Sequence, residues 1–345
     1  MIVRSRAPLR LGLAGGGTDV SPYCDEFGGN VLNATIDRFA WTTLESIEGN
    51  SLSIRSTDLG ISEDVPLVSV MQDDILGGRL KLHRAVYKHI IDKYNSGHPV
   101  PLRITTTCEA PLGSGLGGSS TVVVSIIRAF VEYFNIPLDD YGIANLAIEI
   151  ERNKCGLAGG KQDQYSAAFG GVNFIEFQKS GSVVVNSLKI KNWIICELEA
   201  SILLCFTGVS RESANVIESQ RVGIQSRSDE VLNSLHKLKN DAFLMKQFLL
   251  QGNFEQIITC INNDWENKKK TSKNVSNQRI DKLLDIAKNS GAMAGKVSGA
   301  GGGGFIWFFV DPIKRQDVVN SLSQQGAVVS GVHFTKRGAE AWRIQ

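Results

Sequence analysis

The sequence predicts an α+β protein of two domains, and two observations support this prediction. The chain has 345 residues, which exceeds the usual size of a single domain. Its pattern also changes near residue 190, where a mixture of strand-like segments and a few helices gives way to a mainly helical region that ends in glycine-rich and strand-like segments. We therefore place one domain at residues 1–190 and a second, α+β domain at residues 191–345.

Two helices are expected early in the first half, at residues 80–93 and 120–134. The second of them carries apolar side chains at helical spacing, namely Val122, Val123, Ile126, Ile127, Phe130 and Phe134. Asn135, together with the proline that follows it, is expected to end this helix. A further helical stretch at residues 141–156 and the alternating strand "VNFIEF" at 172–177 complete this half.

The second half begins with "IICELEASILLCF", residues 194–206, which is interpreted as a strand. Three helical segments are expected after it, up to residue 289. The stretch "KVSGAGGGGFIWFFV" then joins a glycine loop to an apolar strand, whose aromatic residues 307–309 are expected to pack in the core. A helix from residue 312 and the strand "AVVSGVHF" at 327–334 close the second half.

The composition excludes several classes of function. Hydrophobic residues make up 42% and charged residues 21%, as in globular proteins, and the formal charge of +2 forms no continuous basic face, so no nucleic-acid partner is expected. No apolar run reaches the about 18 residues of a membrane span, and the start of the chain lacks a signal-peptide core. The six cysteines have no CxxC spacing and are expected to be reduced thiols. We expect a cytoplasmic monomer or homodimer without a membrane partner.

A basic run, Lys268 to Lys270, closes one of the expected helices. Cations are favourable at the carbonyl end of a helix because they complement its dipole. The run is therefore interpreted as a solvated helix end rather than as a ligand site.

The glycine-rich stretch "PLGSGLGGSS" leads into the helix at 120–134 and is expected to bind phosphate, because glycines allow close backbone approach and a helix start favours anions. Gly113, Gly115 and Gly118 also satisfy the dinucleotide pattern GxGxxG. The preceding "LRITTTCEAP" alternates and ends in proline, unlike the buried parallel strand of a dinucleotide fold. A Walker loop is disfavoured because no lysine precedes Ser119 and Ser120. A tight turn without a ligand remains the alternative.

Two more glycine loops occur, "GLAGGGTD" at residues 12–19 and "KVSGAGGGG" at 296–304. A further flexible turn, "GGKQDQ", places Asp163 just after it. These segments together resemble the three motifs of the GHMP kinases, small-molecule kinases named for galactokinase and for homoserine, mevalonate and phosphomevalonate kinases. The resemblance spans nearly the whole chain. It implies a two-domain α+β fold, with an N-terminal domain like ribosomal protein S5 and a ferredoxin-like C-terminal domain, and it implies ATP and Mg²⁺ as cofactors.

The central motif of that family resembles PxxxGLGSSA. The residues that match it in register are Pro111, Gly115, Leu116, Gly117 and Ser119. The loop that the resemblance assigns to the ATP phosphates comprises Pro111, Gly113, Ser114, Gly115, Leu116, Gly117, Gly118, Ser119 and Ser120. The resemblance also implies that Ser119 is a Mg²⁺ ligand, with Glu151 in "IERNKCG" as its acidic partner.

The resemblance assigns the reaction to two residues. Asp163 aligns with the family's catalytic aspartate, which takes or orients the proton of the acceptor hydroxyl. Arg10 falls on the arginine that galactokinases place near the reacting hydroxyl, and Asp19 falls on an aspartate that binds sugar hydroxyls. The loop residues Gly15, Gly16, Gly17 and Thr18 are assigned to the substrate with it. Glycines here replace bulkier polar residues of galactokinases, so galactose is not the expected acceptor.

Within the family, "APLRLGLAGGGTDVSPY" and "FTGVSRESANVIESQ" most resemble kinases of the anomeric hydroxyl of D-glycero-D-manno-heptose 7-phosphate, which supply nucleotide-activated heptose for surface polysaccharides. The expected partner is thus a small phosphosugar. Arg211 suits its phosphate, with Lys161 as a second candidate, and Gly301 and Gly302 of the third loop are expected beside the substrate. The alternatives are another sugar 1-kinase, of the fucose or galacturonate type, and a sugar-binding regulator without turnover.

Overall fold

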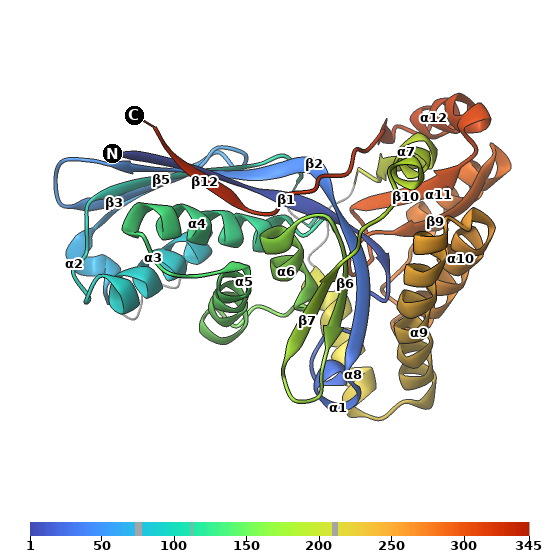
Figure 1. Cartoon of the computed structure of the whole chain (residues 1–345), viewed down its shortest axis with the longest axis horizontal. Coiled ribbons are helices and arrows are strands. Elements are labelled where there is room, and N and C mark those ends of the chain that lie inside the picture. The colour runs from blue at the N-terminus through green and yellow to red at the C-terminus, as the bar shows by residue number, and fades with distance from the viewer. Residues whose placement is uncertain (73–77, 112, 209–212, 345) are drawn as a thin grey trace.

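The computed structural model describes residues 1–72, 78–111, 113–208 and 213–344. They form two sheets that are covered by helices, which confirms the predicted α+β class (Figure 1). The strands are β1 (Ile2–Ala14), β2 (Gly29–Ser46), β3 (Ser51–Ser56), β4 (Ile61–Pro66), β5 (Leu102–Cys108), β6 (Val172–Phe177), β7 (Val183–Ser187), β8 (Ile202–Phe206), β9 (Ala292–Val297), β10 (Phe305–Val310), β11 (Val328–Ser330) and β12 (Glu340–Ile344). The α-helices are α1 (Tyr23–Phe27), α2 (Leu67–Val70), α3 (Lys81–Tyr94), α4 (Gly118–Phe134), α5 (Asp140–Ile148), α6 (Gln162–Phe169), α7 (Asn192–Ser201), α8 (Ser213–Gln225), α9 (Asp229–Gln251), α10 (Phe254–Thr271), α11 (Gln278–Asn289) and α12 (Arg315–Ser323), and a π-helix, η2 (Glu149–Lys154), and a 3₁₀ turn, η3 (Pro312–Lys314), accompany them.

The first sheet has the strand order β12-β1-β2-β5-β3-β4, and β6 pairs with both β2 and β7. Its neighbours are antiparallel except for β3 and β5, which run parallel. Strand β12 comes from the end of the chain and pairs with β1, with Ile344 opposite Ile2. The predicted boundary after residue 190 falls between β7 and α7, and β12 crosses back from the second half into the first sheet (Figure 1).

Helix α4 forms at the position that the sequence predicts and for the expected reason. Its apolar side chains Val123, Ile126, Ile127 and Phe130 recur at spacings of three and four, and all are fully buried. The helix ends at Asn135, which adopts the left-handed conformation that commonly terminates helices. Each fully buried side chain of this kind contributes about 1.5–3 kcal/mol relative to an exposed one. The burial of this face fixes α4, and with it the loop that precedes α4, against the sheet.

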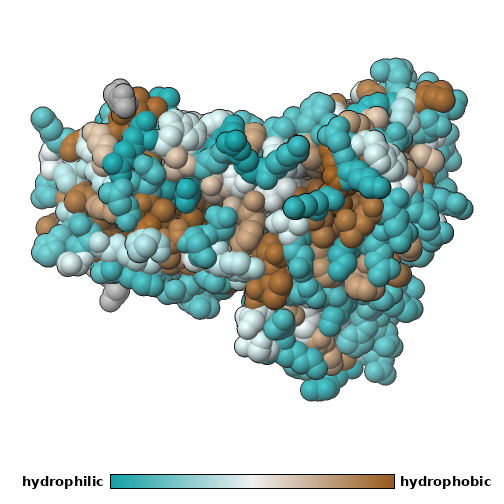
Figure 2. Space-filling view, in the orientation of Figure 1, coloured by the Kyte–Doolittle hydropathy of each residue, from teal (hydrophilic) through white to brown (hydrophobic). Residues whose placement is uncertain are grey.

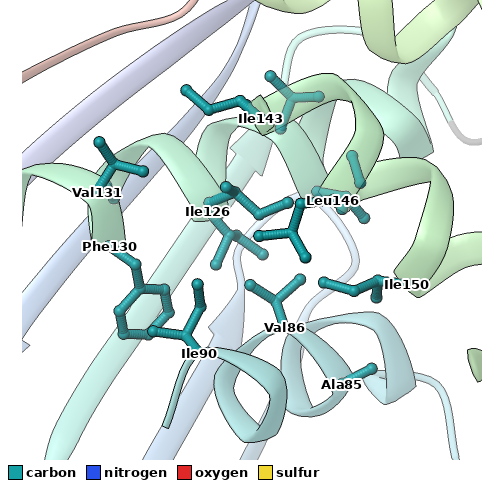
Figure 3. Close-up of a cluster of buried hydrophobic side chains, with 14 of the residues drawn as sticks. Ala85, Val86, Ile90, Ile126, Phe130, Val131, Ile143, Leu146 and Ile150 are labelled. Carbon is teal, nitrogen blue, oxygen red and sulfur yellow. The ribbon is translucent and has the colours of Figure 1, made fainter. Parts of the chain in front are cut away.

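The core around α4 is shared with three other helical elements, α3, α5 and the π-helix η2 (Figure 3). The labelled side chains are Ala85, Val86 and Ile90 from α3, Ile126, Phe130 and Val131 from α4, Ile143 and Leu146 from α5, and Ile150 from η2. They belong to one buried cluster that continues into the first sheet. The helix that carries Glu151 is therefore held rigidly beside the start of α4.

The second sheet has the order β11-β8-β10-β9, and all its pairs are antiparallel. Strand β10 is buried along its whole length, because Trp307 and Phe309 face the core shared with the first domain while Ile306 and Phe308 face the helices on the other side. Burial on both faces explains its uninterrupted apolar sequence. The prediction that the aromatic run packs in the core is confirmed.

Three predictions about the second half are wrong. Residues 192–201 form helix α7 instead of the start of a strand, and only Ile202–Phe206 extends as β8. Ile194 and Leu198 are four residues apart and both buried, which is helical spacing that the apolar run of β8 obscures. Between β8 and β9 the described residues contain four helices, α8 to α11, instead of the expected three. The expected strand at 327–334 is shortened to β11, and Phe334 forms only an isolated bridge with Ile36.

The face of the molecule drawn in Figure 2 is mainly hydrophilic. Figure 2 shows hydrophilic side chains over most of one side of the molecule, with hydrophobic ones in separate patches. Within the described residues, no helix is both long and apolar enough to cross a membrane.

Candidate active site

A cleft of about 680 Å³ lies where the two domains meet, and it collects most of the predicted site residues. The first domain lines it with Arg10, Gly17, Asp19, Val20, Lys81, Gly113, Ser114, Gly115, Gly117, Gly118, Ser119, Ser120, Glu151, Arg152, Leu157, Ala158, Gly159, Gly160, Gln162 and Asp163. The second domain adds Ala214, Ile217, Gln220, Lys268, Gly299 and Ala300. The three glycine loops, far apart in the sequence, thus face one cavity.

The loop before α4 fits a phosphate group. Gly117, with φ of 81°, is the N-cap of α4 and provides no side chain to cap the free N–H groups of the first turn. These N–H groups and the helix dipole favour an anion at this point. The hydroxyl of Ser114 in this loop is buried and has no hydrogen-bond partner in the described part of the chain, so a phosphate oxygen fits there.

This loop also forms the contact between the domains. Gly115 has a φ of 80°, and a Cβ atom placed on it would lie 2.3 Å from the carbonyl oxygen of Ser298. The amide of Phe305 donates to the carbonyl of Ser114 at 2.8 Å. The two glycine loops therefore touch through their backbones, and glycine at 115 is required by both conformation and space.

Arg10 and Asp163 form an ion pair in the cleft. The Arg10 Nε donates to Asp163 Oδ1 at 2.7 Å, and Nη2 lies 2.6 Å from the same oxygen. Arg10 Nη1 donates to the carbonyl of Gly115, so one side chain connects the aspartate to the glycine loop before α4. A Cβ on Gly117 would come within 3.2 Å of Asp163 Oδ2, so the glycine permits the aspartate to approach the loop.

Glu151 lies at the other side of the same loop, in the π-helix η2. Ser120 Oγ donates to its Oε1 at 2.9 Å, and Gln164 Nε2 donates to its Oε2. Burial of this carboxyl raises its pKa, although nearby Arg152 opposes the shift. Hydroxyl and carboxylate oxygens are the donors that Mg²⁺ prefers, so the set of Ser119, Ser120 and Glu151 fits that ion. The structure pairs Glu151 with Ser120, whereas Ser119 lines the cleft without this contact.

Asp19 is fully enclosed by backbone and side-chain amides. Its Oδ2 accepts from the amides of Lys161 and Gln162 at 2.9 and 3.0 Å. Its Oδ1 accepts from the amide of Gly17 and the side chain of Gln162 at 3.1 and 3.2 Å. A Cβ on Gly160 would lie only 2.0 Å from Oδ2, so this turn closes tightly on the carboxylate. Asp19 therefore joins the first glycine loop to the turn that carries Asp163.

Two family models match this chain. The GHMP kinases N terminal domain matches residues 81–171, and the GHMP kinases C terminal model matches residues 245–328. A curated relative, D-glycero-alpha-D-manno-heptose 7-phosphate kinase of Campylobacter jejuni, is 41% identical over 342 residues, which cover 99% of each chain. The chain belongs to the GHMP kinase family. It is an ATP-dependent phosphotransferase, and the predicted family and enzyme class are confirmed.

Solved structures agree with this assignment. A crystal structure of a D-glycero-D-manno-heptose 1-phosphate kinase from Bacteroides thetaiotaomicron has a TM-score of 0.83 at 41% identity and covers 99% of both chains. A putative sugar kinase from Campylobacter jejuni has a TM-score of 0.81 at 40% identity, covering 99% of this chain and 98% of that one. A mevalonate kinase structure, at 20% identity and a TM-score of 0.74, shares the fold. The predicted two-domain GHMP kinase fold is confirmed.

The prediction that Lys268 belongs to a solvated helix end is wrong for this GHMP kinase. Lys268 is only 3% exposed and lines the cleft, and its Nζ donates to the carbonyl of Gly16 at 3.1 Å. The signal that could have found it is helical spacing, because Ile257, Ile261, Asp264 and Lys268 fall on one buried face of α10. Only the next two lysines of the run lie outside that face.

The remaining predicted site residues of this kinase are not among the described residues that line the cleft. Gly15 and Thr18 shape the first loop, since the amide of Gly15 donates to Asp264 and the Thr18 hydroxyl to the carbonyls of Gly15 and Asn30. Leu116 is buried in the core, and Pro111 is exposed at the loop's edge. The third loop reaches the cleft through Gly299 and Ala300, whereas Gly301 and Gly302 pack against the segment at Val275. Arg211 lies outside the described residues.

Proposed function

We propose that this GHMP kinase transfers the γ-phosphoryl group of ATP to the anomeric C1 hydroxyl of D-glycero-D-manno-heptose 7-phosphate. The product would be the 1,7-bisphosphate, for nucleotide-activated heptose biosynthesis toward a surface polysaccharide. The 41% identical relative carries the name of a kinase of this acceptor, and the match covers 99% of this chain. The observation that carries the chemistry is the Arg10–Asp163 pair beside the phosphate loop.

The acceptor proton has a defined destination in this proposal. Both contacts of Arg10 with Asp163 use Oδ1, and Oδ2 has no hydrogen-bond partner in the described part of the chain. Oδ2 accepts the proton of the sugar hydroxyl while that oxygen forms its bond to the γ-phosphorus. The bond from the γ-phosphorus to the β,γ-bridging oxygen breaks, and ADP leaves with that electron pair. Arg10 holds the carboxylate in a fixed orientation throughout.

Mg²⁺ would be held by the Ser119 hydroxyl and Glu151, and would neutralise the charge between the β- and γ-phosphates. Ser120 and Gln164 fix the orientation of the Glu151 carboxylate by hydrogen bonds to its two oxygens. The N–H groups at the start of α4 bind phosphate oxygens, and the contact of the two glycine loops at Gly115 excludes water from one side.

The experiment that tests this function is ATP turnover with Mg²⁺ against a set of acceptors. The set contains D-glycero-D-manno-heptose 7-phosphate, the unphosphorylated heptose, fucose, galacturonate, galactose and mevalonate. ADP release is coupled to NADH oxidation, and ³¹P NMR identifies the product. Selective turnover of the heptose 7-phosphate with an anomeric phosphate signal supports the proposal. Preference for another acceptor would keep the kinase mechanism and replace the substrate, and sugar binding without turnover of any acceptor would favour a regulator.

A further inference from the structure

The cations that line the cleft differ in how they are engaged. Arg10 is paired with Asp163. Arg152 donates to the carbonyls of Leu157 and Gly160 and so braces that turn. Lys81 lines the cleft at the start of α3, in the first domain. Lys161, which is not among the lining residues, forms an ion pair with Asp25 at 3.0 Å. Lys268 is different, because the hydrogen bond that the described chain gives its ammonium goes to a backbone carbonyl and not to a carboxylate.

The surroundings of Lys268 are built to accommodate its ammonium group. A Cβ on Gly16 would lie 3.2 Å from Nζ, so the glycine leaves room for the lysine head. Beside it, Gln220 of α8 lines the cleft and donates to Thr271 at 2.6 Å, which ties α8 to the end of α10. The ammonium thus reaches across the domain boundary, from the second domain to the first glycine loop.

The nearby carboxylates have other partners in direct contact. Asp264 accepts from the amide of Gly15 and forms a buried ion pair with Lys296. Asp19 accepts four hydrogen bonds from amide groups, so its oxygens are already occupied. A lysine ammonium has three N–H donors, and burial without a partner for its charge is unfavourable. The cleft therefore contains a fixed cation with donor capacity to spare, which is what an anionic ligand requires.

We propose that Lys268 binds the phosphate that the acceptor sugar already carries, and that it thereby selects a sugar phosphate over the free sugar. The inference rests on the proposed function, because it takes the acceptor to be a phosphosugar. Lys268 lines the same cleft as Asp163, the residue proposed to act on the acceptor hydroxyl, and its ammonium contacts the first glycine loop at Gly16. The phosphates of ATP have a separate site at the start of α4, where helix N–H groups bind them.

The test compares two acceptors with three forms of the enzyme. The variants are Lys268→Met and a matched control, Lys269→Met, which removes a neighbouring lysine that is paired with Glu266 on the surface. The Michaelis constants for ATP, for D-glycero-D-manno-heptose 7-phosphate and for the unphosphorylated heptose are measured for each form. Lys268→Met is expected to raise KM for the heptose phosphate about 10- to 100-fold, the effect of one charge-assisted hydrogen bond. The values for free heptose and for ATP, and all values of Lys269→Met, should stay within about threefold.

Different outcomes distinguish a failure of the proposed function from a failure of the role proposed for Lys268. If wild-type enzyme turns over only unphosphorylated acceptors, the proposed function and the inference both fail. If wild type prefers the heptose phosphate but Lys268→Met loses equally on both sugars, the function stands and Lys268 is structural. A rise confined to KM for ATP would assign Lys268 to the nucleotide instead. If Lys268→Met does not fold, Lys268→Gln, which keeps hydrogen-bond donors but not the charge, provides the same comparison.

Discussion

Arg10 and Asp163 are 153 residues apart in the sequence, yet the Arg10 Nε lies 2.7 Å from Asp163 Oδ1 in the cleft. The same guanidinium also donates to the carbonyl of Gly115 in the glycine loop before α4. One buried arginine therefore sets the position of the aspartate relative to the loop before α4, which we propose binds the phosphates of ATP. Orientation of this kind matters because proton transfer and phosphoryl transfer must occur between groups held in one geometry.

The Asp163→Asn variant is expected to lower kcat by about 10²- to 10⁴-fold, since an amide cannot accept the proton of the acceptor hydroxyl. Binding of ATP should stay close to wild type, because the start of α4 is unchanged. Steady-state kinetics and calorimetric ATP titration measure the two effects. Asp317→Asn, on the exposed surface of α12, is the control and should behave as wild type. Near-normal turnover of Asp163→Asn would remove Asp163 from the catalytic role.

Two serines are candidates for the Mg²⁺ site, and single alanine variants distinguish them. Ser119→Ala is expected to raise the Mg²⁺ concentration needed for half-maximal rate by about tenfold, because a metal ligand is lost. Ser120→Ala removes a hydrogen bond to Glu151, worth about 0.5–1.5 kcal/mol for a typical pair, so its effect on Mg²⁺ should be smaller. Mg²⁺ titrations at saturating ATP provide the comparison. The reverse order would transfer the ligand role to Ser120.

Protonation of Glu151 is expected to lower the reaction rate at acidic pH. Burial raises the pKa of this carboxyl above its ordinary value of 4.5, so it takes up a proton at a higher pH than an exposed glutamate. Protonation removes the negative charge that attracts Mg²⁺, and the rate should fall as the pH decreases. Added Mg²⁺ should move the midpoint to lower pH, because metal and proton compete for the same carboxylate. A midpoint that is independent of Mg²⁺ would contradict this prediction.

The proposed role of Lys268 predicts that KM for the heptose phosphate depends on pH under alkaline conditions. Burial, reinforced by nearby Lys296 and Arg10 and opposed by Asp264 and Asp19, lowers the pKa of Lys268 from 10.5 to about 8. The ammonium therefore loses its proton as the pH rises through 8, and KM for the heptose phosphate should increase while KM for free heptose does not. Measuring both constants from about pH 7 to about pH 9.5, a range that spans this lowered pKa, tests the prediction. Parallel changes for the two sugars would contradict it.

The lowered pKa of Lys268 should also make the free energy of unfolding depend on pH. Between pH 8 and 10.5 the unfolded chain keeps the proton of Lys268 and the folded chain does not, so the unfolding free energy contributed by this group should rise with pH. Urea unfolding at several pH values, with Lys268→Met as the reference, isolates that contribution. An equal slope in both proteins across this range would show that Lys268 titrates normally.

The contact between the two glycine loops should be intolerant of a side chain. Gly115→Ala is expected to destabilise the fold by more than about 1–2 kcal/mol, because alanine meets both a positive φ and the backbone of Ser298. Gly181→Ala is a matched control, since Gly181 has a φ of 85° and a Cβ atom added there would meet nothing within 4 Å. Urea unfolding and kcat are measured for both. Equal losses would show that the contact between the loops contributes nothing beyond backbone conformation.

Several features of the fold and site followed from local sequence alone. Helix α4 was predicted because its apolar spacing and its terminating Asn135 lie within one continuous segment. The glycine loop that leads directly into α4 was predicted for a similar reason, since the glycines and the helix start are neighbours in the sequence. Helix α7 was missed because the adjacent apolar run of β8 hid the four-residue spacing of Ile194 and Leu198.

What the sequence by itself determined about this kinase is therefore the α+β class and the three glycine loops, because backbone conformation and helix starts depend on neighbouring residues. The tertiary structure alone decided which distant groups meet. It brought β12 back to β1, enclosed Asp19 in amides, paired Glu151 with Ser120 and turned Lys268 into the cleft. Such contacts depend on how whole domains pack, and that packing converts an apparently solvated lysine into a buried cation that lines the cleft.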